Sequence, residues 1–235
     1  MLNLGSKKAF LFDLDNTLYP YEPCHQKGLA RAKALFVTLP GSARNDFFTE
    51  YRKARSAVAR RHRCTAASHS RLLYFRRLCE QIFRAHRVSY AVALHDAYWE
   101  GYFTAMILDR FAKPILNSLR QRGIRIGLVT DLAEEVQLRK ILRLKLVEHL
   151  DVVVTSEEAG REKPNPKIFL AALRRLRVSP ARGVMVGDDY ERDIQGAKRL
   201  GLSTVWVTPD PRNGPAKPAM ADLTVRSLRE LYKIL

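Results

Sequence analysis

Two aspartates stand two positions apart at the end of the first apolar run of the chain. Asp13 and Asp15 directly follow the run 9–12 and precede Asn16 and Thr17. Residues two apart share one face of a strand, and an Asp-Asn-Thr turn can aim the two side chains differently. Carboxylates this close raise the pKa of one of them unless a cation or a proton relieves the repulsion. The pair therefore suits a metal ion and a general acid, although the same residues also form ordinary turns.

Polar residues follow three further apolar runs that are typical of buried strands. The run 124–129 ends at Thr130 and Asp131, the run 150–154 leads towards Lys163 and Pro164, and the run 184–186 leads to Gly187, Asp188, Asp189 and Asp193. Short β-rich runs that alternate with helical patterns predict an α/β fold with a parallel sheet. Functional sites in such sheets lie outside the carboxyl ends of the strands. We therefore expect these polar side chains to meet in one crevice.

The order of these motifs resembles that of the haloacid dehalogenase-like (HAD) hydrolase superfamily. The resemblance rests on Asp13-Leu-Asp15-Asn-Thr17, Thr130, Lys163-Pro164 and Gly187-Asp188-Asp189 with Asp193, and it covers about residues 7–207. The segment from Phe12 to Pro20 also resembles the start of pyrimidine 5′-nucleotidase-like members. The resemblance implies a Rossmann-like core formed by residues 1–19 and 112–235. It also implies an inserted α-helical cap at residues 20–111, for which we expect four or five helices.

The resemblance implies a role for each catalytic residue. Asp13 would be the nucleophile that takes the phosphoryl group as an aspartyl phosphate. Asp15 would protonate the leaving oxygen and then activate the hydrolytic water. Thr130 would donate a hydrogen bond to a phosphoryl oxygen, and Lys163 would offset the charge on Asp13 and on the phosphate.

The resemblance also implies a Mg²⁺ site. Its protein ligands would be the carboxylates of Asp13 and Asp188 and the backbone carbonyl of Asp15, with Asp193 orienting the metal shell. Mg²⁺ prefers oxygen ligands and commonly binds one or two carboxylates together with a substrate phosphate. Asp188 and Asp189 are also suited to capping a following helix, and the sequence leaves open whether Asp189 or Asp193 supports the metal.

The acid at position 15 favours phosphoryl transfer over dehalogenation, because a halide leaving group needs no proton. We therefore predict a Mg²⁺-dependent phosphatase that hydrolyses a small nucleotide or sugar phosphate. Two alternatives remain open: a phosphomutase of the same fold, and a non-catalytic HAD-like module that binds a polyanion. The sequence indicates neither the substrate nor the oligomeric state.

The composition sets further limits. The 235 residues carry a formal charge of +17, and the three cysteines lack the spacing of a zinc site or a disulfide framework. The first eight residues lack the apolar segment of a secretory signal. The sequence contains no run of about 18 apolar residues, so it predicts no membrane span. We expect a cytoplasmic protein with no membrane association.

Residues 51–79 hold nine Lys or Arg residues and no acid. Such a segment can be a solvated helix face, can steer an anionic substrate, or can bind a polyanion. No nucleic-acid-binding motif accompanies it, so we do not expect nucleic acid as a partner. His25, His69 and Arg71 are candidates for contacts to the leaving group, although residues of these types are more often structural or solvated.

Overall fold

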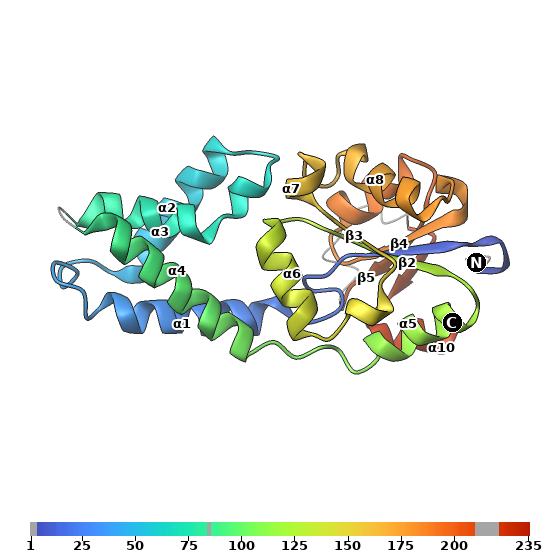
Figure 1. Cartoon of the computed structure of the whole chain (residues 1–235), viewed down its shortest axis with the longest axis horizontal. Coiled ribbons are helices and arrows are strands. Elements are labelled where there is room, and N and C mark those ends of the chain that lie inside the picture. The colour runs from blue at the N-terminus through green and yellow to red at the C-terminus, as the bar shows by residue number, and fades with distance from the viewer. Residues whose placement is uncertain (1–3, 84–85, 210–220) are drawn as a thin grey trace. The chain divides into compact units, whose positions relative to one another are not determined.

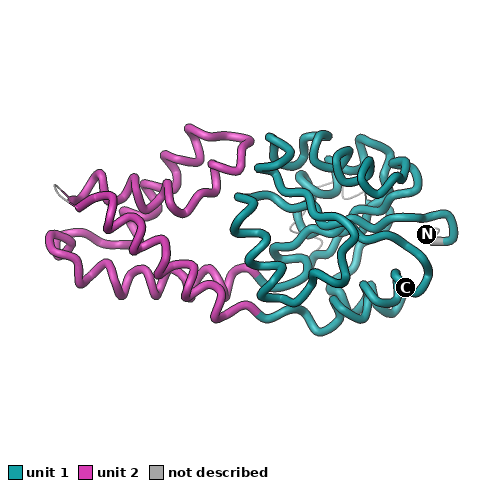
Figure 2. The backbone as a smooth tube through the Cα atoms, in the orientation of Figure 1, with its two compact units in different colours: residues 1–20, 107–235 teal, residues 21–106 magenta. Residues whose placement is uncertain are grey.

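The computed structural model describes residues 4–83, 86–209 and 221–235, which form two compact units (Figure 2). Unit 1 combines residues 1–20 with 107–235, and unit 2 comprises residues 21–106. The second boundary lies five residues before the predicted one at 111, because residues 107–111 are tied to unit 1. The backbone N–H of Asp109 donates to the carbonyl of Leu18 (2.9 Å), and the carboxylate of Asp109 accepts from the N–H of Phe111 (2.7 Å).

Unit 1 is built on a parallel sheet of six strands, which confirms the predicted α/β class. The strands are β1 (Ala9–Phe12), β2 (Arg125–Thr130), β3 (Val152–Thr155), β4 (Gly183–Gly187), β5 (Ser203–Val207) and β6 (Leu223–Val225). Their order in the sheet is β3-β2-β1-β4-β5-β6. β1 pairs with both β2 and β4, and all four of its residues are buried. A fully apolar run suits a strand that is covered on both faces.

Helices cover both faces of this sheet (Figure 1). They are α5 (Ala112–Gln121), α6 (Glu134–Arg143), α7 (Ser156–Ala159), α8 (Pro166–Leu176), α9 (Gly196–Lys198) and α10 (Leu228–Ile234), with a π-helical turn, η5 (Tyr190–Gln195). In α8 the side chain of Asn165 caps the first turn, Pro166 occupies the first helical position, and Arg177 ends the helix in the left-handed conformation. The capped helix places an apolar face on the sheet and fixes the preceding segment, which carries Lys163.

Unit 2 contains four α-helices within its described residues. They are α1 (Tyr21–Phe36), α2 (Phe47–Arg61), α3 (Arg71–Ile82) and α4 (Arg87–Thr104), and a short turn, η2 (Ala66–His69), precedes α3. α1 and α4 approach closely at two glycines. A Cβ on Gly28 would lie 2.8 Å from the carbonyl oxygen of Tyr98, and one on Gly101 would lie 2.7 Å from that of Lys27. Glycine at both positions allows this close helix packing.

The aromatic residues of α4 are part of the core of unit 2. Tyr98, Trp99 and Tyr102 are buried, and their rings pack edge to face or tilted against one another. They therefore serve mainly to pack the helices. None of the helices within the described residues is both long and apolar enough to cross a bilayer.

Candidate active site

Asp13 lies at the carboxyl end of the central strand. Its backbone N–H donates to the carbonyl of Val186 (2.9 Å), which extends the pairing of β1 with β4 by one residue. This register places Asp13 beside Gly187 and Asp188, although about 175 residues separate them in the sequence. The side chain of Asp13 is buried.

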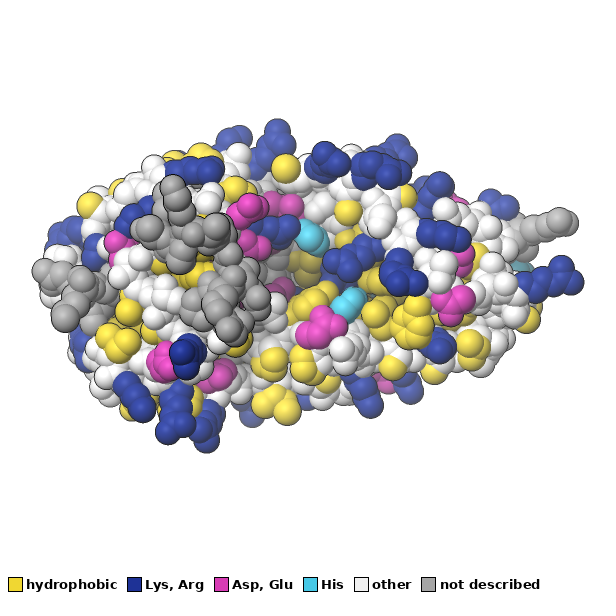
Figure 3. All heavy atoms as spheres, turned by 180° about the vertical axis from the view of Figure 1, so that it is seen from behind, with side chains coloured by type: hydrophobic (Ala, Val, Ile, Leu, Met, Phe, Trp, Pro, Cys, Tyr) yellow, Lys and Arg dark blue, Asp and Glu magenta, His cyan; other side chains and the backbone are white. Residues whose placement is uncertain are grey.

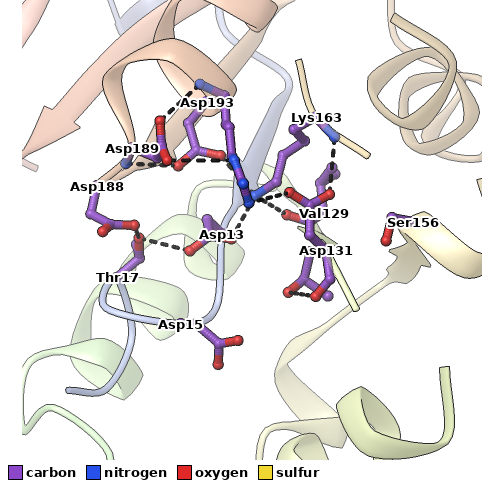
Figure 4. A network of polar contacts seen from close by, with 12 residues as sticks. Asp13, Asp15, Thr17, Val129, Asp131, Ser156, Lys163, Asp188, Asp189 and Asp193 are labelled. Carbon is purple, nitrogen blue, oxygen red and sulfur yellow. Dashed lines mark hydrogen bonds and ion pairs between the residues drawn. The ribbon is translucent and has the colours of Figure 1, made fainter. Parts of the chain in front are cut away.

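Lys163 is the buried cation of this group (Figure 4). Its Nζ donates to Oδ1 of Asp13 (2.6 Å), to Oδ1 of Asp193 (2.7 Å) and to the carbonyl of Val129 (3.1 Å). These three bonds use all three hydrogens of an ammonium group. Burial by itself lowers the pKa of Lys163, but the surrounding carboxylates, Asp13 foremost, raise it well above its ordinary value. Lys163 is therefore charged and joins the first motif to the last.

Three carboxylates of this group are close enough to hold one metal ion. Asp13, Asp188 and Asp193 each offer an oxygen, and these oxygens lie within 4.8 Å of one another. Oγ1 of Thr17 bridges two of the residues, with distances of 3.1 Å to Asp13 and 3.3 Å to Asp188. Burial, followed by the charge of Asp13, raises the pKa of Asp188 to about 7. Burial also raises the pKa values of Asp13 and Asp193, and Lys163 opposes both shifts.

Asp131 is a further acid of this charged group. Its carboxylate accepts from the backbone N–H of Lys163 (2.9 Å) and lies 3.5 Å from the guanidinium of Arg192. Asp189 also lies 3.7 Å from the guanidinium of Arg192. When fully ionised, the five acids Asp13, Asp131, Asp188, Asp189 and Asp193 exceed the two cations Lys163 and Arg192 by three negative charges. One divalent cation would offset two of these charges, so the residues present fit a metal such as Mg²⁺.

Asp131 and Arg192 were not among the predicted site residues. The only indication in the sequence was that Asp131 follows Thr130 at the end of a strand. Nothing in the sequence marked Arg192, which contacts Asp131 across 61 positions of chain.

Asp189 and Asp193 have different roles in the structure. The carboxylate of Asp189 caps η5 by accepting from the N–H groups of Glu191 and Arg192 (3.0 Å each). Asp193 is fully buried and faces Lys163. The acidic cluster thus includes Asp193, and Asp189 serves the helical turn.

Gly187 is required at its position by Asp193. A Cβ at residue 187 would lie 2.2 Å from Oδ2 of Asp193, which is far inside van der Waals contact. Oδ2 of Asp193 also accepts from the backbone N–H of Asp189 (3.1 Å). The Gly-Asp-Asp sequence therefore lets the aspartate four residues further on pack directly against the end of β4.

Asp15 lies apart from the group around Lys163 (Figure 4). Both of its carboxylate oxygens are 2.8 Å from Nζ of Lys140 in α6, and the hydroxyl of Tyr19 donates to Oδ1. The side chain of Lys140 is only 1 % exposed. The structure thus places the carboxylate of Asp15 outside the acidic cluster, and a metal contact through its backbone carbonyl stays a prediction. Lys140 was missed because its helix carries several similar basic residues.

Thr130 ends β2, the strand next to β1. Its Oγ1 accepts a hydrogen bond from Nε2 of Gln137 (2.6 Å), and the same amide donates to the carbonyl of Asp131 (2.7 Å). Among the described residues, no hydrogen bond joins the side chain of Thr130 to Asp13 or Lys163. The hydroxyl of Thr130 donates a long hydrogen bond to the carbonyl of Asp131 (3.5 Å), so its hydrogen would have to leave that carbonyl to serve a ligand.

Comparisons with known proteins agree with this geometry. Residues 7–201 match the haloacid dehalogenase-like hydrolase family. The ribulose-1,5-bisphosphate 5-phosphatase of Halopiger xanaduensis is 42 % identical, over 97 % of this chain and 98 % of that protein. The glyceraldehyde 3-phosphate phosphatase of Methanopyrus kandleri is 34 % identical, over 97 % of both. The crystal structure of a HAD phosphatase from Thermococcus onnurineus superposes with a TM-score of 0.74 at 30 % identity, covering 97 % of both chains. These similarities confirm the resemblance carried by the four motifs, and the chain belongs to the haloacid dehalogenase-like hydrolase family.

Proposed function

We propose that this protein is a Mg²⁺-dependent phosphatase that hydrolyses a small sugar phosphate through an aspartyl phosphate on Asp13. The observation that carries the proposal is the contact between Lys163 and Asp13 (2.6 Å) beside the cluster of Asp13, Asp188 and Asp193. The similar proteins named above act, by their names, on ribulose 1,5-bisphosphate and glyceraldehyde 3-phosphate. Their names support a sugar or triose phosphate over a nucleotide as the substrate.

Asp13 is suited to be the nucleophile because each of its oxygens is held. Oδ1 accepts from Lys163, and Oδ2 accepts from Thr17. In the first step a carboxylate oxygen of Asp13 forms a bond to phosphorus, and the bond from phosphorus to the leaving oxygen breaks. In the second step water attacks the phosphorus and the bond to Asp13 breaks, which releases inorganic phosphate. The positive charge of Lys163 offsets the negative charge that gathers at Asp13 and the phosphoryl group.

Asp15 would be the acid and base of these steps. It would donate a proton to the leaving oxygen in the first step and take one from water in the second. Lys140 and Tyr19 fix the position of its carboxylate. Thr130, whose hydroxyl is held by Gln137, would donate to a phosphoryl oxygen.

Asp13, Asp188 and Asp193 are the residues that would hold or orient Mg²⁺. Bound there, the ion would offset most of the excess negative charge and polarise the phosphoryl oxygens. Without that compensation, a dianionic phosphate would face a net repulsive group of carboxylates.

Hydrolysis of a generic aryl phosphate tests the nucleophile. The wild-type protein with Mg²⁺ should release inorganic phosphate, and Asp13→Asn should lose at least about a thousandfold in rate because the covalent route is closed. Asp96→Asn is the matched control, because Asp96 is an exposed acid of unit 2. Full activity in Asp13→Asn would exclude the nucleophile assignment.

The same preparation separates the two alternatives. A phosphomutase would need a bisphosphate activator and would release little inorganic phosphate. A polyanion-binding module would show no turnover across sugar phosphates, together with salt-dependent nucleic-acid binding that survives Asp13→Asn. On the face shown in Figure 3, Lys and Arg side chains are spread widely.

A further inference from the structure

Unit 2 contains a buried arginine that lacks a carboxylate partner. Arg71 begins α3, and only 7 % of it is exposed. Its Nη1 donates to the carbonyl of His69 (2.6 Å), its Nε donates to the hydroxyl of Tyr98 (3.4 Å), and its Nη2 donates to the hydroxyl of Tyr21. Among the described residues, no Asp or Glu forms an ion pair with it. The formal charge of Arg71 is therefore not balanced within this part of the protein.

Aromatic rings surround this guanidinium. Its Cζ lies 5.6–5.9 Å from the ring centroids of Tyr21, Tyr74, Tyr98 and Trp99. Ring faces attract a cation, but each of them does so more weakly than a carboxylate partner would. Burial by itself lowers the pKa of Arg71, but the neighbouring tyrosines raise it well above its ordinary value. The site therefore keeps a positive charge that rings and neutral hydroxyls offset only in part.

His25 is linked to this guanidinium through the hydroxyl of Tyr98, which contacts both side chains. Nδ1 of His25 is 2.7 Å from the hydroxyl of Tyr98. Burial, followed by the charges of Arg71 and Arg55, lowers the pKa of His25 to about 4, so His25 is neutral at neutral pH. Its ring stacks on that of Tyr21, with 5.3 Å between the centroids.

Tyr51 is the least satisfied member of the group. It is 2 % exposed, and its hydroxyl has no hydrogen-bond partner among the described residues. Its ring lies next to those of His25 and Tyr74, with centroids 6.4 Å and 5.9 Å away. A buried hydroxyl without a partner is costly, and it marks a position where a ligand atom can be bound.

We propose that Arg71, Tyr21, His25, Tyr51 and Tyr98 form a site for a phosphate group within unit 2. A buried guanidinium that lacks a carboxylate partner attracts an anion, and an oxyanion with three free oxygens can use the guanidinium, a tyrosine hydroxyl and an imidazole N–H together. The Tyr51 hydroxyl supplies a donor that is not already engaged. The proposal extends beyond the proposed function, because it does not depend on the chemistry at Asp13.

Two sources supply such a group: the non-scissile phosphate of a sugar bisphosphate, and free inorganic phosphate. A binding experiment with the full chain tests the site itself. The Asp13→Asn variant, which prevents turnover, is titrated with inorganic phosphate and separately with ribulose 1,5-bisphosphate, and the His25 ring is followed by NMR. An anion beside Arg71 should raise the pKa of His25 by at least about one unit, because it offsets the charge that lowers it.

Substitutions at the site test which residues bind. Tyr51→Phe removes only the hydroxyl that has no partner, so the fold should be kept while the affinity falls about threefold to tenfold. Tyr90→Phe is the matched control, since the ring of Tyr90 packs on Phe83 and His86. Arg71→Lys keeps the charge but loses the planar fork, and it should weaken phosphate binding by at least about tenfold.

A kinetic comparison separates the two sources. If the phosphate belongs to the substrate, Arg71→Lys should lower the ratio of kcat/KM for a sugar bisphosphate to that for an aryl phosphate by about tenfold. If the site binds free phosphate, the ratio should stay constant while inorganic phosphate still shifts the pKa of His25. The proposal is wrong if neither ligand shifts His25 and neither variant changes binding or the ratio. If the wild-type protein with Mg²⁺ does not hydrolyse the aryl phosphate, the proposed function is contradicted instead.

Discussion

Removal of the divalent cation should make the stability of this protein depend on pH through Asp188. Asp188 has a pKa of about 7 in the folded chain against an ordinary value of 3.8. A carboxyl group whose pKa is raised by folding stabilises the fold when it is protonated. Its contribution is fully present below pH 3.8 and is lost as the pH rises through about 7.

The size of the effect follows from the shift. One unit of pKa corresponds to about 1.4 kcal/mol, so at about pH 5.5 the group still contributes about 2 kcal/mol, and at about pH 8 almost nothing. Asp13 and Asp193 add to the effect with the same sign, because burial raises their pKa values as well. The metal-free protein should therefore lose at least about 2 kcal/mol of these contributions between the two pH values.

His25 acts in the opposite direction and must be separated from this effect. Its pKa falls from 6.5 to about 4 on folding, so stability is lost as the pH falls through 6.5 towards 4. At about pH 5.5 this loss is about 1.4 kcal/mol. Asp188→Asn keeps the shape of the side chain and the titration of His25, but it removes the Asp188 carboxyl group. The difference between wild type and variant therefore removes the effect of His25 and leaves that of Asp188 together with its interaction with Asp13 and Asp193.

The assay is urea unfolding at both pH values, with chelator and with excess Mg²⁺. With chelator, the free energy of unfolding of the wild type relative to Asp188→Asn should fall by about 2 kcal/mol from about pH 5.5 to about pH 8. Mg²⁺ should stabilise the wild type more at the higher pH, because the ligands must be ionised to bind it. An identical pH dependence in the two proteins, or equal stabilisation by Mg²⁺ at both pH values, would refute the charge argument for this site.

Two further substitutions test the packing and pairing around the site. Gly187→Ala should cost about 1–3 kcal/mol of stability and most of the Mg²⁺-dependent activity, because the new methyl group would displace Asp193. Gly123→Ala is the control, because a Cβ at residue 123 would meet nothing within 4 Å, although Gly123 has a φ of +69°. This substitution should cost about 1 kcal/mol of stability and leave the activity unchanged. Equal activities of the two variants would contradict the role given to Gly187. Lys140→Met should lower kcat at least about tenfold, because it releases the carboxylate of Asp15. In the double variant with Asp15→Asn, this loss should not add to the loss caused by Asp15→Asn alone. Additive losses would show that the two residues act independently.

The sequence was sufficient to predict the fold class and most of the residues that meet at the strand ends. Buried parallel strands need continuous apolar runs, and their carboxyl ends meet at one edge of the sheet, so the polar residue after each run could be placed. Asp13, Lys163, Asp188 and Asp193 come together in the structure as this reasoning predicts. The strand β5 was not predicted, since no polar residue of the motifs follows it.

The cation that pairs with each acid was decided only by tertiary structure. Lys140 meets Asp15 across 125 positions of sequence, and Arg192 meets Asp131 across 61. The sequence contains 41 Lys and Arg residues, and spacing alone cannot select among them. Helix packing and strand register select the partners, because they determine which of these side chains are buried beside an acid. The apolar runs and the motifs thus determine the fold and the residues at its strand ends, and the pairing of buried charges follows from three-dimensional packing.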